Sequence, residues 1–141
     1  MSSLRPLAFV AQNRFVDMVA RVKQSAHIEE IDVPELQQML DAHPAASSAD
    51  VHVVDVRESA EHAQGTIPGA ICLPRGIVDR DIERYIPADT TDKVVLVCAG
   101  GVRSIMAAES LKRMGFANVL SLRGGMRGWQ MQGMPIEKQQ K

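Results

Sequence analysis

The stretch that most constrains the fold is the continuous apolar run from Val94 to Val97, which leads through Cys98 and two glycines into a helical pattern. A strand that is apolar at every position is buried on both faces, which is typical of the middle of a parallel sheet. The helical pattern begins near Ser104 and ends at Gly115, a residue suited to a helix C-terminus. A buried strand followed at once by a helix predicts an α/β domain.

Strand-like and helical segments alternate along the rest of the chain. Short apolar, β-branched runs predict strands within residues 51–56, 68–74, 92–99 and 118–122. Amphipathic patterns predict helices that start after Asp32, within 57–65, 77–87 and 104–115, and around Trp129. Pro68 and Pro74 confine the strand between them to a short or edge position. We therefore expect a mainly parallel central sheet that is flanked by helices on both faces.

A chain of 141 residues suits one folding unit. We divide it into a helical extension, residues 1–28, and a main domain, residues 29–141. The extension carries arginines and few acids, as a mitochondrial presequence does, but four of its apolar residues share one helix face: Phe15, Met18, Val19 and Val22. We expect a helix that docks on its own domain or on a second copy in a homodimer. No stretch approaches the length of a membrane span.

Composition excludes several classes of function. The formal net charge is −1 and no basic block occurs, so nucleic acid is not expected as a partner. The two cysteines, Cys72 and Cys98, form neither a CxxC pair nor a Cys/His cluster with the spacing of a zinc site. We therefore expect no structural metal, and a reducing compartment such as the cytoplasm.

Cys98 stands where ligands bind in open α/β sheets, just beyond the carboxyl end of a strand. The two following glycines let the backbone curl with its N–H groups pointing inward, and the helix that follows adds unpaired N–H groups and a partial positive charge. A thiol in this position ionises readily. We predict a nucleophilic Cys98 in an amide cradle formed by the residues that follow it: Ala99, Gly100, Gly101, Val102, Arg103 and Ser104.

Three further residues can be assigned from their positions. Cys72 lies between apolar neighbours with no glycine loop, and we interpret it as a core cysteine. Arg57 and Arg75 each follow a predicted strand, so either can bind an anionic substrate at the same edge of the sheet. For Arg57 we favour the alternative of a structural ion pair with Glu58 or Glu61. For Arg75 a solvated surface position remains open.

Three segments of the chain together resemble the rhodanese, or sulfurtransferase, family. "CAGGVRS" is similar to the active-site loop of that family, and "DVRESAEHAQGTIPGA" resembles its first signature. "AAESLKRMGFANVLSLRGGMRGW" resembles its closing segment. The resemblance covers about residues 29–135, with the three parts in the family's order. Two positions depart from the pattern, because Thr66 stands where histidine is usual and His62 where an aromatic or bulky apolar residue is common.

The resemblance implies a rhodanese-like fold and a sulfurtransferase. Cys98 would accept a sulfane sulfur from thiosulfate or from a glutathione or protein persulfide, hold it as a persulfide, and pass it to a thiol or cyanide. It implies no metal and no organic cofactor, since the enzyme's own sulfur is the carrier. A sulfur-relay protein would be a suitable partner, and a membrane would not.

Two alternatives remain open. Phosphatases and arsenate reductases of this fold have five residues between cysteine and arginine, whereas four separate Cys98 from Arg103 here. The tighter loop favours a sulfur atom over a tetrahedral oxyanion. A rhodanese-like module that binds a partner without catalysis is the second alternative, and the intact cysteine loop argues against it.

Overall fold

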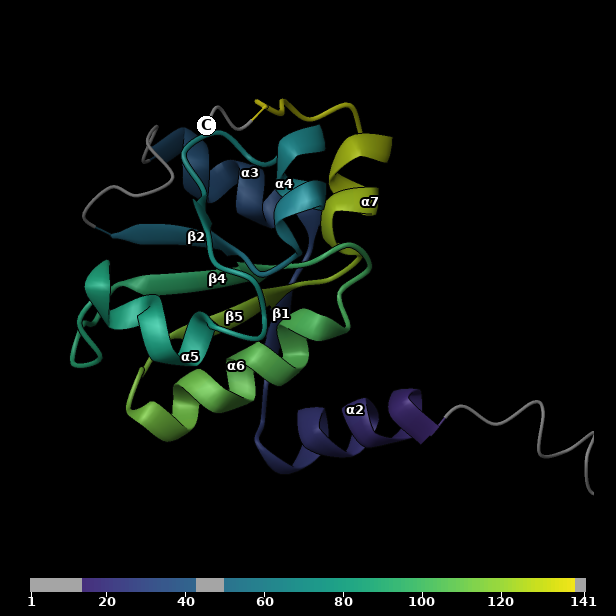
Figure 1. Ribbon diagram of the computed structural model, residues 1–141. Coiled ribbons are helices and arrows are strands. Elements are labelled where there is room, and N and C mark those ends of the chain that lie inside the picture. The colour runs from purple at the N-terminus through teal and green to yellow at the C-terminus, as the bar shows by residue number, and fades with distance from the viewer. Residues whose placement is uncertain (1–13, 43–49, 139–141) are drawn as a thin grey trace, which may run out of the picture.

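The computed structural model describes residues 14–42 and 50–138 (Figure 1). Its sheet has five parallel strands in the spatial order β1-β5-β4-β2-β3. The strands are β1 (Glu29–Ile31), β2 (Val51–Asp55), β3 (Ile71–Cys72), β4 (Lys93–Val97) and β5 (Val119–Leu122). The predicted α/β class is confirmed, and the apolar strand β4 takes the central position that its composition predicts.

Helices cover both faces of the sheet (Figure 1). One face carries α3 (Val33–Ala42), α4 (Ser59–Gln64) and α7 (Gly125–Met131). The other face carries α5 (Val78–Asp81), the 3₁₀ turn η2 (Ile82–Arg84) and α6 (Arg103–Met114). The extra helix α2 (Arg14–Ser25) packs against α6.

The central strands are apolar throughout because alternate residues feed two separate cores. Val95 and Val97 pack with α3 and α7, while Val94 and Leu96 pack with α5 and α6. Cys98 continues the alternation and belongs to the core beneath α6. Since all strands run in parallel, the loops that follow β2, β4 and β5 gather at one edge of the sheet.

Two elements differ from the sequence expectation. Strand β1 was not predicted, because three residues are too few to show an alternating pattern, and it forms by pairing with β5. The apolar stripe of α2 is only partly used: Val19 is buried, but Phe15 and Met18 are exposed.

The start of α3 follows the sequence signal closely. Asp32 accepts the amide of Glu35 at 2.9 Å, and the Glu35 carboxylate accepts the amide of Asp32 at 2.9 Å. This reciprocal pair is a capping box, which satisfies two amides that a helix start leaves free.

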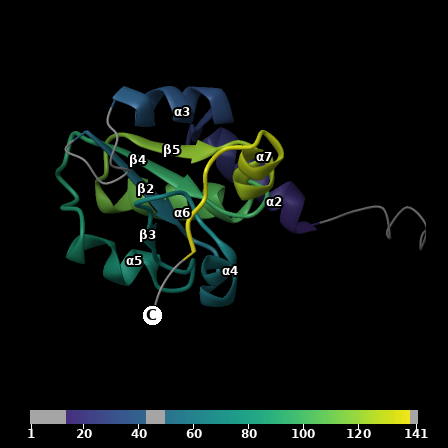
Figure 2. The ribbon, with the colours of Figure 1, turned by 90° about the horizontal axis from the view of Figure 1, so that it is seen from above.

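The segment after α7 returns across the molecule. Figure 2 shows it passing from α7 over the sheet toward α4. Glu137 then forms an isolated antiparallel bridge with Thr66, so the last described residues pack onto the loop that follows α4. Among the described residues, no helix has the length and apolar character that a membrane crossing requires.

Candidate active site

The loop between β4 and α6 curls around the sulfur of Cys98. The amide of Gly101 donates to Cys98 Sγ at 3.1 Å, and the Ser104 hydroxyl lies 3.4 Å from the same sulfur. Gly101 has a φ of +92°, and a Cβ there would lie 3.1 Å from the Gly124 nitrogen. Glycine is therefore required for the curl. Of the predicted cradle residues, Gly101 supplies the amide and Ser104 the hydroxyl that reach the sulfur directly.

Helix α7 holds the loop from outside. The amides of Met126 and Arg127 donate to the carbonyls of Cys98 and Ala99 at 2.8 and 3.0 Å. In a trans peptide the N–H points opposite to the C=O, and the described chain has no cis bond. The N–H groups of Ala99 and Gly100, which belong to the same two peptides, therefore point away from α7.

This clamp depends on the absence of a side chain at the start of α7. Gly125 has a φ of +55°, and a Cβ on it would lie 2.7 Å from the carbonyl carbon of Ala99. Real Cβ atoms do not approach backbone so closely. The glycines of the closing segment thus let α7 approach the loop between β4 and α6 within hydrogen-bonding distance.

A buried pair of hydroxyls lies behind the cysteine. Ser104 is 2.8 Å from Ser121, and neither residue is exposed to solvent. Ser121 is the polar residue of strand β5 and was not predicted as part of the site. Its signal was a serine within an otherwise apolar strand, where a hydroxyl needs a partner. Cys98 itself is only 1 % exposed, so its sulfur is shielded from solvent.

Arg103 connects the loop between β4 and α6 to the first signature. Its guanidinium donates to both carboxylate oxygens of Glu61 in α4, at 3.0 and 3.1 Å. The hydrogen bond from Arg103 is the main reason why the pKa of Glu61 falls from 4.5 to about 2, and Glu61 in turn raises the pKa of Arg103. Sequence analysis considered Glu61 only as a partner of Arg57 and missed this pair.

Arg57 requires a correction. Its side chain is buried and donates to Asp55 at 2.8–3.1 Å and to the Gly65 carbonyl at 2.6 Å. It is therefore a structural residue inside the loop cluster and not a substrate-binding residue at the rim. The ion pair favoured from sequence exists, but its partner is Asp55 and not Glu58 or Glu61. Asp55 also accepts the Arg57 amide at 3.0 Å.

The two departures from the first signature meet at the same carboxylate. The Thr66 hydroxyl donates to Asp55 at 2.7 Å, and His62 Nε2 lies 3.5 Å from it without a hydrogen bond. With Cys72 these side chains are close enough to resemble a metal site in the described part of the chain. The Arg57 guanidinium already occupies Asp55, and its positive charge would repel a cation. The cluster is suited to an ion pair and not to a metal.

Cys72 lies at the edge of this cluster. It is half-buried, so it is more accessible than the core position expected from sequence. Burial and the charge of Asp55 raise its pKa to about 11. The thiol therefore stays protonated at neutral pH, which makes it a poor nucleophile.

Two further arginines lie near the loop. Arg75 is 3.8 Å from Asp79 and 3.4 Å from Ser110, and it lines one groove together with Arg103. Arg127, which sequence analysis did not single out, places its guanidinium over the catalytic loop, where a Cβ on Gly100 would lie 2.9 Å from Arg127 Nη1. Arg127 lies within the closing segment that resembles the rhodanese family, but its place over the loop depends on how α7 packs there.

Comparisons with known proteins agree with the fold. A family model described as "Rhodanese-like domain" matches residues 32–132. A curated Allochromatium vinosum protein named sulfurtransferase is 40% identical over 109 residues, which cover 77% of this chain and 94% of that protein.

Two solved structures resemble the fold with a TM-score of 0.75 each. One is a thiosulfate sulfurtransferase from Pseudomonas aeruginosa, 29% identical, with 88% of this chain and 23% of that chain covered. The other is a Rhodopseudomonas palustris protein of unknown function described as a possible tyrosine phosphatase. It is 28% identical, with 90% of this chain and 96% of that chain covered.

Proposed function

The chain belongs to the family of rhodanese-like domains, and from that premise we propose that it is a sulfurtransferase that carries a sulfane sulfur on Cys98. The family resemblance inferred from the three sequence segments is confirmed by the same matches. A relative named sulfurtransferase supports the reaction class. The donor, the acceptor and the persulfide intermediate are our proposal.

The observation that carries the proposal is the amide of Gly101, which donates to Cys98 Sγ at 3.1 Å. A hydrogen bond from an amide stabilises a thiolate more than a thiol, because the charged acceptor strengthens the bond. The Ser104 hydroxyl at 3.4 Å and the start of α6 act in the same direction. Cys98 is thereby prepared as a nucleophile without a general base.

The proposed reaction has two steps, and atoms and charge balance in each. The Cys98 thiolate attacks the outer sulfur of thiosulfate, the donor's S–S bond breaks, and sulfite leaves with the electron pair. The product is a Cys98 persulfide anion. A thiolate or cyanide then attacks its terminal sulfur, forms a persulfide or thiocyanate, and returns the Cys98 thiolate. Neither step needs a metal, an organic cofactor or an outside oxidant.

The remaining cradle amides would stabilise the persulfide. Helix α7 occupies the carbonyls of Cys98 and Ala99, so the opposite N–H groups are available to an anion inside the loop. Donors fixed in place before the reaction stabilise developing charge at little reorganisation cost. Arg75 and Arg127 add positive charge that attracts an anionic donor toward the loop.

Mass spectrometry of the intact protein tests the proposal. After incubation with thiosulfate the chain should gain one sulfur mass, and Cys98→Ser should gain none. Cys72→Ser is the matched control, because it removes the other cysteine and should leave the gain unchanged. If no sulfane donor loads the protein, or if Cys72→Ser abolishes loading while Cys98→Ser does not, the proposal is wrong.

The same sample separates the alternatives. A non-catalytic module that only binds a partner would take no sulfur from thiosulfate, persulfides or protein donors. A phosphatase would hydrolyse p-nitrophenyl phosphate through Cys98. We expect no such hydrolysis, because the loop has only four residues between Cys98 and Arg103 and is too tight for a tetrahedral oxyanion.

A further inference from the structure

A groove of about 360 Å³ is formed by α3, α7, the loop after α4 and the segment that follows α7. Helices α3 and α7 cover one face of the sheet, whereas Cys98 belongs to the core beneath α6 on the other face. The volume of the groove lies within the range of natural small-molecule sites, about 300–1,000 Å³. The residues that line it come from distant parts of the sequence: Gln37, Leu40, Asp41, Pro68, Trp129 and Pro135.

Hydrogen bonds within the protein fix the walls of this groove. The Trp129 indole N–H donates to the Pro135 carbonyl at 2.7 Å, so the segment after α7 is held against that helix. The bridge between Thr66 and Glu137 holds the same segment two residues further on. Trp129 and Leu40 are buried and belong to the core on this face. A ligand therefore meets walls that are already formed, which lowers the entropic cost of binding.

One side chain of the lining has an unsatisfied hydrogen-bonding group. Gln37 Nε2 donates to Asp41 Oδ1 at 2.7 Å, and because a carboxylate only accepts, this contact identifies the nitrogen end of the amide. Gln37 Oε1 is buried and has no hydrogen-bond partner in the described part of the chain. Native proteins rarely leave a buried acceptor unpaired. The last torsion of a glutamine side chain is broad, so a modest rotation turns Oε1 toward the groove while Nε2 stays near Asp41.

Asp41 supplies a negative charge at the rim of the groove. It is exposed, and it forms no ion pair with a cationic side chain among residues 14–42 and 50–138. Gln37 and Asp41 lie one turn apart on α3, so the amide and the carboxylate are on the same side of the helix. Two neighbouring acceptors, one of them charged, favour a ligand that carries several N–H donors and a positive charge.

We propose that this groove binds a small organic cation in which a planar amidinium or guanidinium group is joined to an apolar body. The planar group donates to Gln37 Oε1 and to the Asp41 carboxylate, and the apolar body packs against Leu40 and the two prolines. A planar cation suits the site better than an ammonium, because it has a fork of N–H donors and is more weakly hydrated. The inference is independent of the proposed sulfurtransferase function, since neither Cys98 nor its loop lines the groove.

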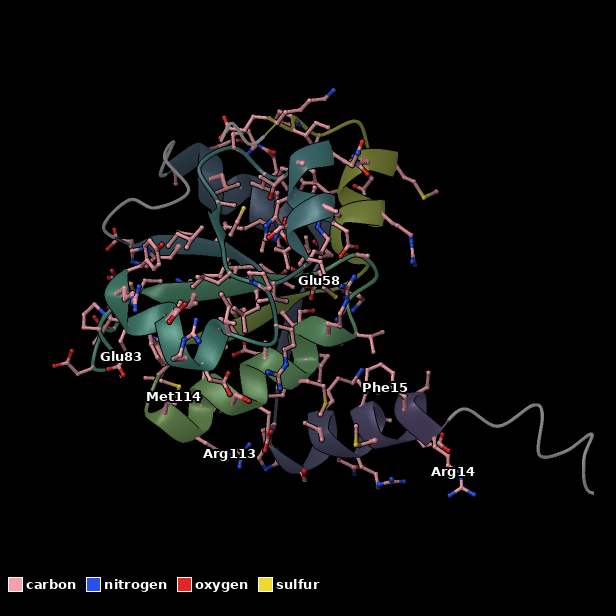
Figure 3. The ribbon with its side chains drawn as sticks, viewed as in Figure 1. Arg14, Phe15, Glu58, Glu83, Arg113 and Met114 are labelled. Carbon is pink, nitrogen blue, oxygen red and sulfur yellow. The ribbon has the colours of Figure 1, made fainter. Side chains whose placement is uncertain are left out.

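Calorimetric titration of the full chain with benzamidine tests the inference. We expect saturable binding of one benzamidine per chain. Benzamide has the same shape without the charge, and it should bind at least about tenfold more weakly, because a charge-assisted hydrogen bond becomes a neutral one. Asp41→Asn should raise the Kd for benzamidine about tenfold for the same reason. Glu83→Gln is the matched control: it also removes one exposed carboxylate, and Figure 3 shows Glu83 on the face of the sheet opposite to α3. This control should leave the Kd unchanged.

Gln37→Leu provides a second measurement with two opposite readouts. The change removes the unpaired acceptor, so the urea midpoint of the ligand-free protein should rise. The Kd for benzamidine should nevertheless increase, by at least about fivefold, because one acceptor of the ligand is lost. A purely structural role of Gln37 would change the urea midpoint and leave the Kd as it is.

Four results would contradict the inference. Equal affinity for benzamidine and benzamide means that the groove recognises no charge. Equal weakening by Asp41→Asn and Glu83→Gln means that benzamidine responds only to the net charge of the protein. If an arginine-bearing tripeptide binds at millimolar concentration and benzamidine does not, the occupant is a segment of another protein and the small-molecule class is wrong. If neither binds, the groove is not a cation site.

Discussion

The clamp between α7 and the catalytic loop makes Gly125→Ala the most informative single change. A Cβ at this position would lie 2.7 Å from the carbonyl carbon of Ala99, so α7 and the loop must separate. The left-handed backbone costs an alanine about 1–2 kcal/mol. Loss of the two amide bonds from Met126 and Arg127 adds about 0.5–1.5 kcal/mol each. We expect the free energy of unfolding to fall by about 2–5 kcal/mol, and sulfur transfer to fall with it.

Two other glycines separate the cost of the left-handed backbone from the cost of breaking the contact between α7 and the loop. Gly133 also has a positive φ, +73°, but a Cβ there meets nothing within 4 Å. Gly133→Ala should therefore show only the backbone cost, about 1–2 kcal/mol. Gly128 lies inside α7, and its Cβ would be at an ordinary 3.6 Å from Val33. Gly128→Ala should be neutral or stabilising by up to about 1 kcal/mol, because alanine favours a helix over glycine.

Urea unfolding followed by the fluorescence of Trp129, the single and fully buried tryptophan, measures all three variants. Sulfur loading of Cys98 is recorded in parallel. If Gly125→Ala loses no more stability than Gly133→Ala and still loads sulfur at the wild-type rate, the close approach of α7 does not hold the loop. The account of the site given above would then be wrong.

Three further changes test other parts of the site. Because Arg103 lowers the pKa of Glu61 from 4.5 to about 2, their pair stabilises the fold above about pH 4.5 and loses this contribution as the pH falls toward 2. The free energy of unfolding, measured in urea, should therefore fall more for wild type than for Glu61→Gln over this range, by less than about 1 kcal/mol for so exposed a pair. Parallel pH curves for the two proteins would exclude the pair's role. Arg127→Met should raise KM for thiosulfate more than it lowers kcat, whereas Arg113→Met, at the far end of α6, should change neither. An equal effect of both variants would mean that Arg127 acts only through the net charge of the protein. Ser104→Ala should slow sulfur loading and destabilise the fold by about 1–3 kcal/mol, since a buried hydroxyl partner is lost; unchanged loading measured by mass spectrometry would remove Ser104 from the mechanism.

Much of the fold could be predicted from local pattern. Strand β4 could be predicted from its continuous apolar run, which indicates burial on both faces. Helix α6 could be predicted from its amphipathic period and its Gly115 cap. Strand β3 lies at the sheet edge, as its flanking prolines indicate. Strand β1 could not be predicted, because its three residues become a strand only through pairing with β5.

The site likewise has features that could be predicted from the sequence and features that could not. The cysteine, its glycines and the following helix are neighbours in sequence, so a nucleophile at the strand end could be proposed from the chain alone. The pairs Arg103–Glu61 and Ser104–Ser121 join elements that are distant in sequence, and no spacing indicates them. Arg57 was assigned to two roles, and only packing decided that its partner is Asp55.

The sequence by itself determined the alternation of strands and helices, the position of the thiol at a strand end and the tight loop around it, because these depend on residues within one or two turns of each other. The tertiary structure alone decided which arginines are used internally and which carbonyls α7 occupies. Those features arise when segments far apart in the chain pack together, and the energy of such contacts depends on distance in space and not on separation in sequence.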